Sequence, residues 1–194
     1  MSFEVELKAH VSDPLALQKR LELLPSISPA ICELKQDTYF CRKGGDALFR
    51  MRLEQTGKSF ESMQGSLVFT YKNKVIRDGI EVNEEVEFSS SSDQSPCALQ
   101  FFLNMGHEVY ITKTKRGYIY TYSVVPELPL LTIELVEVVA LGWFIEMEFV
   151  LEDKSLIEQA RYNLLLVLDS LGIGRSDIED RYYMHLLKKK KPEA

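Results

Sequence analysis

Apolar and polar residues alternate along much of the chain, which is the pattern of half-buried β-strands. In residues 3–8 the odd positions are apolar, whereas the even positions are Glu4, Glu6 and Lys8. Successive side chains of a strand point to opposite faces, so these three charges share one face. The same pattern predicts further strands over residues 33–40, 47–54, 66–74, 80–88, 109–122, 130–139 and 143–149. Residues 109–122 are expected to form a strand pair that bends near Gly117.

Four segments repeat apolar residues with the period of an α-helix. The first follows an N-cap at Ser12-Asp13 and a proline in its first turn, Pro14. The expected helices cover residues 14–24, 96–105, 154–171 and 176–188. Together the elements predict an α+β protein with one domain over residues 1–187. The lysine-rich end, residues 188–194, is expected to be a basic, disordered tail.

Charged residues on the predicted strands are grouped by sign in pairs two positions apart. The pairs are Glu4/Glu6, Arg50/Arg52, Glu85/Glu87, Lys113/Lys115 and Glu146/Glu148, and Lys8 and Lys72 add single bases. One interpretation is a set of independent, half-solvated strands. The other is a sheet that closes with its charged faces inward, so that acids meet bases across the lumen. We expect the second: a closed eight-stranded antiparallel β-barrel, or tunnel, with a charged lumen and the helices packed outside.

Burying so much charge is costly unless the charges are paired or hold ligand and metal, so the tunnel is interpreted as the functional site. Carboxylate oxygens suit Mg²⁺ and Mn²⁺, and Lys and Arg suit phosphate. Inside a cleft, Glu4 and Glu6 would form a cation site beside a phosphate-binding Lys8.

The composition limits the kinds of molecule that the protein is expected to bind. A formal net charge of -6 over 194 residues argues against a general nucleic-acid binder, which needs a basic surface. No apolar run reaches the ~20 residues that span a bilayer, so no membrane association is expected. The three cysteines, Cys32, Cys41 and Cys97, lack metal-site spacing and indicate reduced thiols in a cytoplasmic protein.

The ordered motifs resemble one known family. Glu4-Val5-Glu6-Leu7-Lys8 resembles the E-x-E-x-K signature of the CYTH superfamily, the triphosphate tunnel metalloenzymes. Further segments resemble the family's motifs in order along the chain: 36–40, Arg50-Met51-Arg52, Thr70-Tyr71-Lys72, Glu85-Val86-Glu87, Lys113-Thr114-Lys115 and 141–148. The end of the chain, Leu171-Gly172-Ile173 through Tyr183 to Leu187, is similar to the branch of class IV adenylyl cyclases.

This resemblance implies a tunnel that binds a nucleoside triphosphate or another triphosphate with Mg²⁺ or Mn²⁺. Glu4, Glu6, Glu146 and Glu148 would hold the metal, and Glu85 and Glu87 would support it or order the bases. The phosphates would be bound by Lys8, Arg50, Arg52, Lys72, Lys113 and Lys115, with Arg77 and Arg116 as further contacts. Lys8, Glu4 and Glu6 would be the residues closest to the reaction.

The chain departs from the family pattern at two positions. Val136 stands where the family often has an acidic residue; either Glu134 or Glu137 replaces that ligand, or one metal contact is absent. Lys115 stands in place of an arginine, which keeps the charge and loses the two-pronged geometry.

Three functions fit these residues. The first is a class IV-type adenylate cyclase that converts ATP to cyclic AMP and pyrophosphate. The second is a metal-dependent triphosphatase acting on inorganic tripolyphosphate, thiamine triphosphate or a nucleoside triphosphate. The third is a non-catalytic triphosphate-binding module, which Val136 favours. A barrel edge or the apolar C-terminal helices could also support a homodimer.

Overall fold

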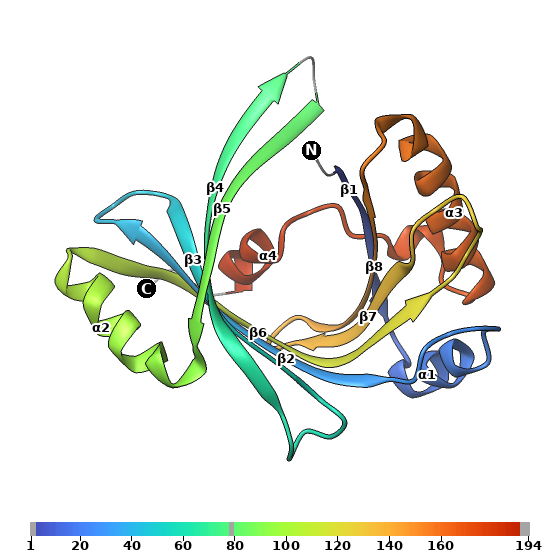
Figure 1. The fold of residues 1–194 in the computed structure, drawn as a ribbon, viewed down its shortest axis with the longest axis horizontal. Coiled ribbons are helices and arrows are strands. Elements are labelled where there is room, and N and C mark those ends of the chain that lie inside the picture. The colour runs from blue at the N-terminus through green and yellow to red at the C-terminus, as the bar shows by residue number, and fades with distance from the viewer. Residues whose placement is uncertain (1–2, 78–79, 191–194) are drawn as a thin grey trace. The chain divides into compact units, whose positions relative to one another are not determined.

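The computed structural model describes residues 3–77 and 80–190, with the backbone alone for residues 72–77 and 80–85. Eight strands form one sheet in the order β1-β8-β7-β6-β2-β3-β4-β5. The pairs β1/β8, β7/β8, β3/β4 and β4/β5 are antiparallel. The strands are β1 (Phe3–Val11), β2 (Ile31–Arg42), β3 (Ala47–Gly57), β4 (Gln64–Arg77), β5 (Ile80–Ser91), β6 (His107–Tyr122), β7 (Leu131–Val138) and β8 (Gly142–Leu151) (Figure 1).

The α+β class is confirmed, but the prediction of a closed barrel is wrong. The strand order begins with β1 and ends with β5, so the described strands form an open sheet. Alternation of polar and apolar residues determines which face of each strand is polar. It carries no information about whether the first and last strands hydrogen-bond to each other. The charged lumen therefore stays a prediction.

Residues 107–122 form a single strand, not the expected pair with a bend at Gly117. Gly117 is required for a different reason. A Cβ atom there would lie 2.0 Å from the carbonyl oxygen of Leu135, because the β7 backbone passes close by. Only glycine tolerates such an approach.

The chain divides into two compact units. Unit 1 comprises residues 1–32 and 116–194, and unit 2 comprises residues 33–115. Strands β2 and β6 each contribute residues to both units.

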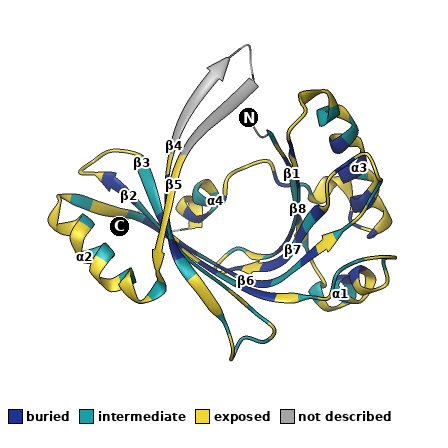
Figure 2. Cartoon of the chain, in the orientation of Figure 1, coloured by how far each residue is buried: buried dark blue, intermediate teal, exposed yellow. Residues whose placement is uncertain are grey.

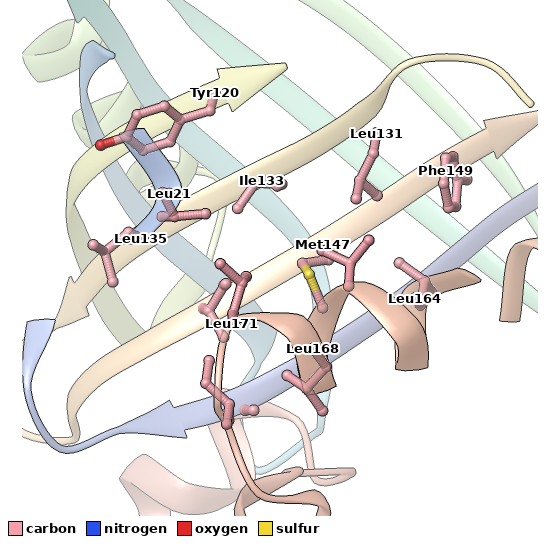
Figure 3. Packing of buried hydrophobic residues seen from close by; sticks show 14 of the residues in the cluster. Leu21, Tyr120, Leu131, Ile133, Leu135, Met147, Phe149, Leu164, Leu168 and Leu171 are labelled. Carbon is pink, nitrogen blue, oxygen red and sulfur yellow. The ribbon is translucent and has the colours of Figure 1, made fainter. Parts of the chain in front are cut away.

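In unit 1, two helices cover the apolar face of strands β1, β7 and β8. Helix α1 (Pro14–Glu22) begins at Asp13, whose carboxylate accepts a 3.0 Å hydrogen bond from the Ala16 amide. Helix α3 (Ile157–Ser170) buries Ala160, Leu164, Val167 and Leu168. Figure 3 shows Leu164 and Leu168 next to Met147 and Phe149 of β8. This packing directs the other, charged face of these strands away from the helices.

In unit 2, helix α2 (Ser95–Asn104) lies against a smaller aromatic core. The Phe40 and Phe49 rings stack at 4.9 Å, and Phe102 of the helix contacts both. Phe40 is fully buried, and Figure 2 shows that much of α2 stays exposed. The apolar residues of β2, β3 and β4 thus face α2, and their charged residues face the other way.

The C-terminal region differs from the predicted helix over 176–188. A 3-10 turn at Arg175–Asp177 is followed by an isolated bridge between Ile178 and Ala9 of β1. The Glu179 amide donates a 2.9 Å hydrogen bond to the Lys8 carbonyl. Helix α4 (Tyr183–Lys190) starts only after this contact, because residues 178–179 use their backbone groups on β1. It continues three residues into the segment expected as a tail.

None of the described helices is long and apolar enough to cross a membrane.

Candidate functional site

Unit 1 carries a charged face on three adjacent strands, which we call the glutamate face. It consists of Glu4, Glu6 and Lys8 of β1, Glu134 of β7, and Glu146 and Glu148 of β8. The register places Glu6 opposite Glu148 and Lys8 opposite Glu146 in the β1/β8 ladder. In the β7/β8 ladder, Glu134 lies opposite Glu146. Directly opposite residues of an antiparallel pair point to the same side, so the structure brings these residues together.

Glu4 is at the exposed end of this face. It lies opposite Val150, which is two residues after Glu148 on β8. Both Glu4 and Val150 are exposed to solvent.

Helix α4 contacts the glutamate face through Tyr183. The Tyr183 hydroxyl donates a 2.7 Å hydrogen bond to Oε1 of Glu146. The Lys8 ammonium lies 5.3 Å from the centroid of the same ring. Burial raises the pKa of the Tyr183 phenol far above its usual range, and the Glu146 carboxylate raises it further. The phenol therefore keeps its proton and acts as a hydrogen-bond donor to Glu146. Nothing in the sequence pointed to this contact of Tyr183.

Val136 lies where the glutamate face becomes apolar. It is fully buried and opposite Phe144, whose ring meets that of Tyr183 at 4.9 Å. Glu134, two residues earlier, is on the glutamate face, so its use in place of the missing acid stays a prediction. Glu137 is exposed on the other side of β7, opposite Trp143.

The donor set of the glutamate face suits a divalent cation. Within the described residues, no three His, Cys, Asp or Glu side chains already converge on a point that would hold one. Two pairs of like charges nevertheless lie directly opposite each other, Glu6/Glu148 and Glu134/Glu146, and such pairs repel. Mg²⁺ and Mn²⁺ bind carboxylate oxygens, and a cation here would relieve this repulsion. The residues therefore fit the metal in chemistry and register.

Unit 2 carries a second charged face, which we call the basic face. It includes Arg50 and Arg52 of β3 together with Lys113 and Lys115 of β6. Asp37 of β2 joins two of these bases. Its carboxylate accepts hydrogen bonds from Arg52, with Nε to Oδ1 at 2.6 Å and Nη2 to Oδ2 at 3.0 Å. The Lys113 ammonium lies 2.9 Å from Oδ2.

The charges of this cluster alter one another's titration. Burial raises the pKa of Asp37, but the Lys113 and Arg52 charges outweigh it and hold that pKa below its usual range. Burial lowers the pKa of Lys113, and the Lys115 charge adds to this, whereas Asp37 opposes it. The Asp37 contact raises the pKa of Arg52 despite burial. Asp37 is thus an anion that keeps two buried cations in place.

Further acids of unit 2 balance the bases. The Lys35 ammonium lies 2.7 Å from Oε1 of Glu33, and both side chains are buried. Glu54 is 3.9 Å from both Lys35 and Arg52. Asp37, Glu33 and Lys35 were not among the predicted site residues. Their alternation on β2 was the available signal, because Glu33, Lys35 and Asp37 occupy every second position.

Arg50 is held by a chain of hydrogen bonds across β3, β4 and β5. Its Nη2 donates to Oγ1 of Thr70 at 3.0 Å, and that hydroxyl donates to Oε2 of Glu87 at 2.9 Å. The Arg50 Nε is buried with no hydrogen-bond partner among the described residues. A buried donor without an acceptor costs about 1–3 kcal/mol, and an anionic ligand could supply the acceptor. Glu87 is thus linked to Arg50 through the Thr70 hydroxyl, and its predicted role of ordering the bases stays a prediction.

One predicted residue, Arg116, does not join these faces in the described structure. Arg116 is exposed, and alternation along β6 directs it away from Lys113 and Lys115. The side chains of Lys72, Glu85 and Arg77 lie outside the described residues, although the backbone register pairs Lys72 with Glu85.

Comparison with solved structures shows the same fold in several organisms. The PH1819 protein from Pyrococcus horikoshii OT3 is 25% identical, with a TM-score of 0.72 over 97% of this chain and 100% of its own. A candidate adenylate cyclase from Vibrio parahaemolyticus is 19% identical, with a TM-score of 0.70 over 96% and 98%. HpAC1 from Hippeastrum, a candidate adenylyl cyclase with a dominant triphosphatase activity, is 15% identical, with a TM-score of 0.62 over 100% and 98%. The last two likenesses concern the fold alone.

A comparison with curated proteins finds no match. A family model, that of the CYTH domain, matches residues 2–183. This match covers nearly the whole chain and agrees with the motifs on the glutamate and basic faces. The protein therefore belongs to the CYTH domain family.

Proposed function

We propose that the protein is a metal-dependent enzyme acting on a triphosphate, and that its reaction is the class IV-type conversion of ATP to cyclic AMP and pyrophosphate. The observation that carries the proposal is the pairing of chemistries in one CYTH chain: a face of glutamates in unit 1 and a face of ordered bases in unit 2. The first suits Mg²⁺ or Mn²⁺ and the second suits phosphate oxygens.

On the basic face, Arg50, Arg52, Lys113 and Lys115 would bind the phosphates. Asp37 holds Arg52 and Lys113 in position before substrate arrives, which lowers the cost of ordering them on binding. The Nε of Arg50 has no hydrogen-bond partner among the described residues, so an oxyanion ligand that accepts from it would be bound more tightly. Lys72 would extend the same set.

On the glutamate face, Glu6, Glu134, Glu146 and Glu148 would hold the metal, with Glu4 at the exposed end and Lys8 beside them for a phosphate oxygen. A bound Mg²⁺ or Mn²⁺ would supply charge neutralisation at the phosphates and activation of an attacking oxygen. In the cyclase reaction the ribose 3′-oxygen bonds to the α-phosphorus, and the bond from that phosphorus to the bridging oxygen breaks. Pyrophosphate leaves, and the proton of the 3′-hydroxyl passes to solvent. The chain's contribution is positioning and electrostatic stabilisation.

Hydrolysis of a triphosphate is the second candidate. It would use the same residues, with water attacking the terminal phosphorus, and it needs no group that recognises adenine or ribose. The dominant triphosphatase activity of HpAC1, a protein of the same fold, favours this alternative.

Product analysis separates the candidates. The purified protein is incubated with ATP, or with tripolyphosphate, and either Mg²⁺ or Mn²⁺. Cyclic AMP with an equal amount of pyrophosphate would support the cyclase. ADP with phosphate, or cleavage of tripolyphosphate without a cyclic product, would support the triphosphatase. Saturable triphosphate binding without turnover under either metal would overturn the enzymatic proposal in favour of a binding module.

A further inference from the structure

Tyr183 is the residue through which helix α4 contacts the glutamate face. Its side chain meets two members of that face at once, Glu146 through the hydroxyl and Lys8 through the ring. Lys8 and Glu146 are themselves opposite each other in the β1/β8 ladder. Tyr183 therefore covers one acid–base pair of the proposed metal site.

The position of Tyr183 is fixed by contacts that do not involve the charges. The Tyr183 ring packs edge-on against Phe144 at 4.9 Å and belongs to a core cluster with Val138. At the far end of α4, the Lys190 ammonium donates a 2.7 Å hydrogen bond to the Ala140 carbonyl. Upstream, the Glu179 amide is bonded to the Lys8 carbonyl. The phenol is thus held by the helix and not by the carboxylate that it contacts.

The hydrogen bond to Glu146 is compatible with ligation of a metal. A carboxylate has two oxygens with about four lone-pair sites, so a donor on Oε1 leaves capacity for a cation. Hydrogen bonds from neighbouring groups to a ligating carboxylate fix its orientation, and their loss commonly costs about 10–100-fold in metal affinity.

We propose that Tyr183 is a positioning residue for the metal site: its hydroxyl orients the Glu146 carboxylate for a divalent cation, and its ring faces the Lys8 ammonium. The inference rests on the proposed function, because it requires a metal at the glutamate face. It adds a residue of α4 to that site and makes docking of this helix a condition of full metal affinity.

Replacement of Tyr183 by phenylalanine isolates the hydroxyl. Tyr183→Phe keeps the ring, and with it the Phe144 contact and the cation–π contact of Lys8. The matched control is Tyr182→Phe, which removes a phenol from the adjacent position, where the ring is half exposed and contacts His185. Thermal unfolding without metal checks that both variants keep the fold.

The measurement is binding of Mn²⁺ alone, followed by the electron paramagnetic resonance signal of the free ion. Tyr183→Phe is expected to weaken Mn²⁺ binding by about 10–100-fold, and Tyr182→Phe to leave it within about 2-fold. On a Glu146→Gln background, the Tyr183→Phe effect should shrink to less than about 2-fold, because the hydroxyl acts through that carboxylate.

The outcomes are distinct. Saturable Mn²⁺ binding that is unchanged or tighter in Tyr183→Phe overturns the role of Tyr183 and leaves the proposed function standing. An equal loss on the Glu146→Gln background also overturns it, because a general effect on the fold would act without Glu146. Absence of saturable Mn²⁺ binding in the wild-type protein removes the metal site, and the inference with it.

Discussion

Asp37 and Arg52 form a two-pronged ion pair inside unit 2, with both guanidinium bonds at or below 3.0 Å. The Asp37 side chain is fully buried, and that of Arg52 is 14% exposed. Lys113 shares the same carboxylate. One acid therefore determines the position of two bases that are proposed to bind phosphate.

Substitution of Asp37 by asparagine should measure how much the Asp37 charge contributes to the stability of the protein. Asp37→Asn keeps the shape but leaves the charges of Arg52 and Lys113 buried without their acid. Removal of one partner of a buried pair costs about 3–5 kcal/mol, so we expect a loss of this size in the free energy of unfolding. Urea unfolding at neutral pH measures it.

The control for this substitution is Glu54→Gln. Glu54 is 38% exposed and lies 3.9 Å from Arg52, so its loss should cost less than about 1 kcal/mol. A similar small loss for Asp37→Asn would show that the ion pair adds little to the stability of unit 2. If Asp37→Asn shows the expected large loss, addition of tripolyphosphate should recover part of the lost stability, because the anion replaces the missing negative charge.

Acid sensitivity should arise in part from Glu179. Hydrogen bonds from Arg181 lower the pKa of Glu179 to about 2, from an ordinary value of 4.5, and His10 contributes a further contact at 3.2 Å. A lowered folded-state pKa stabilises the protein above the unfolded value, and this stabilisation is lost as the pH falls through the folded value. The stability contributed by Glu179 is thus complete above about pH 4.5 and lost near pH 2.

The matching variant is Glu179→Gln, studied by urea unfolding between pH 7 and pH 2. Because the Arg181 side chain is half exposed, the contribution is expected to be only about 1–2 kcal/mol at pH 7. The difference between wild type and variant should shrink as the pH falls from 4.5 to 2. A difference that is constant over this range would assign the effect to packing instead of charge.

The sequence predicted the strands well because their charges occupy alternate positions. All eight strands lie within a few residues of the predicted segments, and the glutamates of β1 and β8 share a face as the alternation required. The same signal could not predict the open strand order, since closure depends on hydrogen bonding between terminal strands. It also misplaced the last helix, because residues 178–179 bind the backbone of β1 instead of continuing a helical period.

The supporting residues of the site were harder to predict than its charged pairs. Asp37 stood in a motif that was noticed, but the charges at every second position of β2, Glu33, Lys35 and Asp37, alternate in sign, so no like-charged pair marked them. Tyr183 acts through a contact between residues 37 positions apart. Such a contact depends on the packing of α4, which no local pattern encodes.

Neutralisation of Glu148 should remove turnover at little cost in stability. Glu148→Gln takes away a proposed metal ligand and also a charge directly opposite Glu6. Activity with Mg²⁺ or Mn²⁺ is expected to fall by at least about 100-fold, because charge stabilisation at phosphorus is lost. The free energy of unfolding should change by less than about 1 kcal/mol. The matched control is Glu137→Gln, a neutralised glutamate on the other side of β7. Equal turnover in both variants would contradict the placement of the metal.

Replacement of Val136 by aspartate, an acidic residue of the kind that the family often has here, should destabilise the protein without adding a metal ligand. Val136 is fully buried at the apolar end of the glutamate face, opposite Phe144, whose ring contacts Tyr183 of α4. A carboxylate there would be desolvated without a partner, which costs several kcal/mol unless it takes up a proton. We expect Val136→Asp to lower the free energy of unfolding by about 3 kcal/mol or more, whereas Val136→Thr, a smaller polar change, should cost about 1–2 kcal/mol. Mn²⁺ titration of the unfolding transition supplies the decisive comparison. If Val136→Asp is destabilised and Mn²⁺ does not restore its stability, the metal site ends at Glu134 and Glu146. If Mn²⁺ restores the stability fully, the metal site extends to position 136.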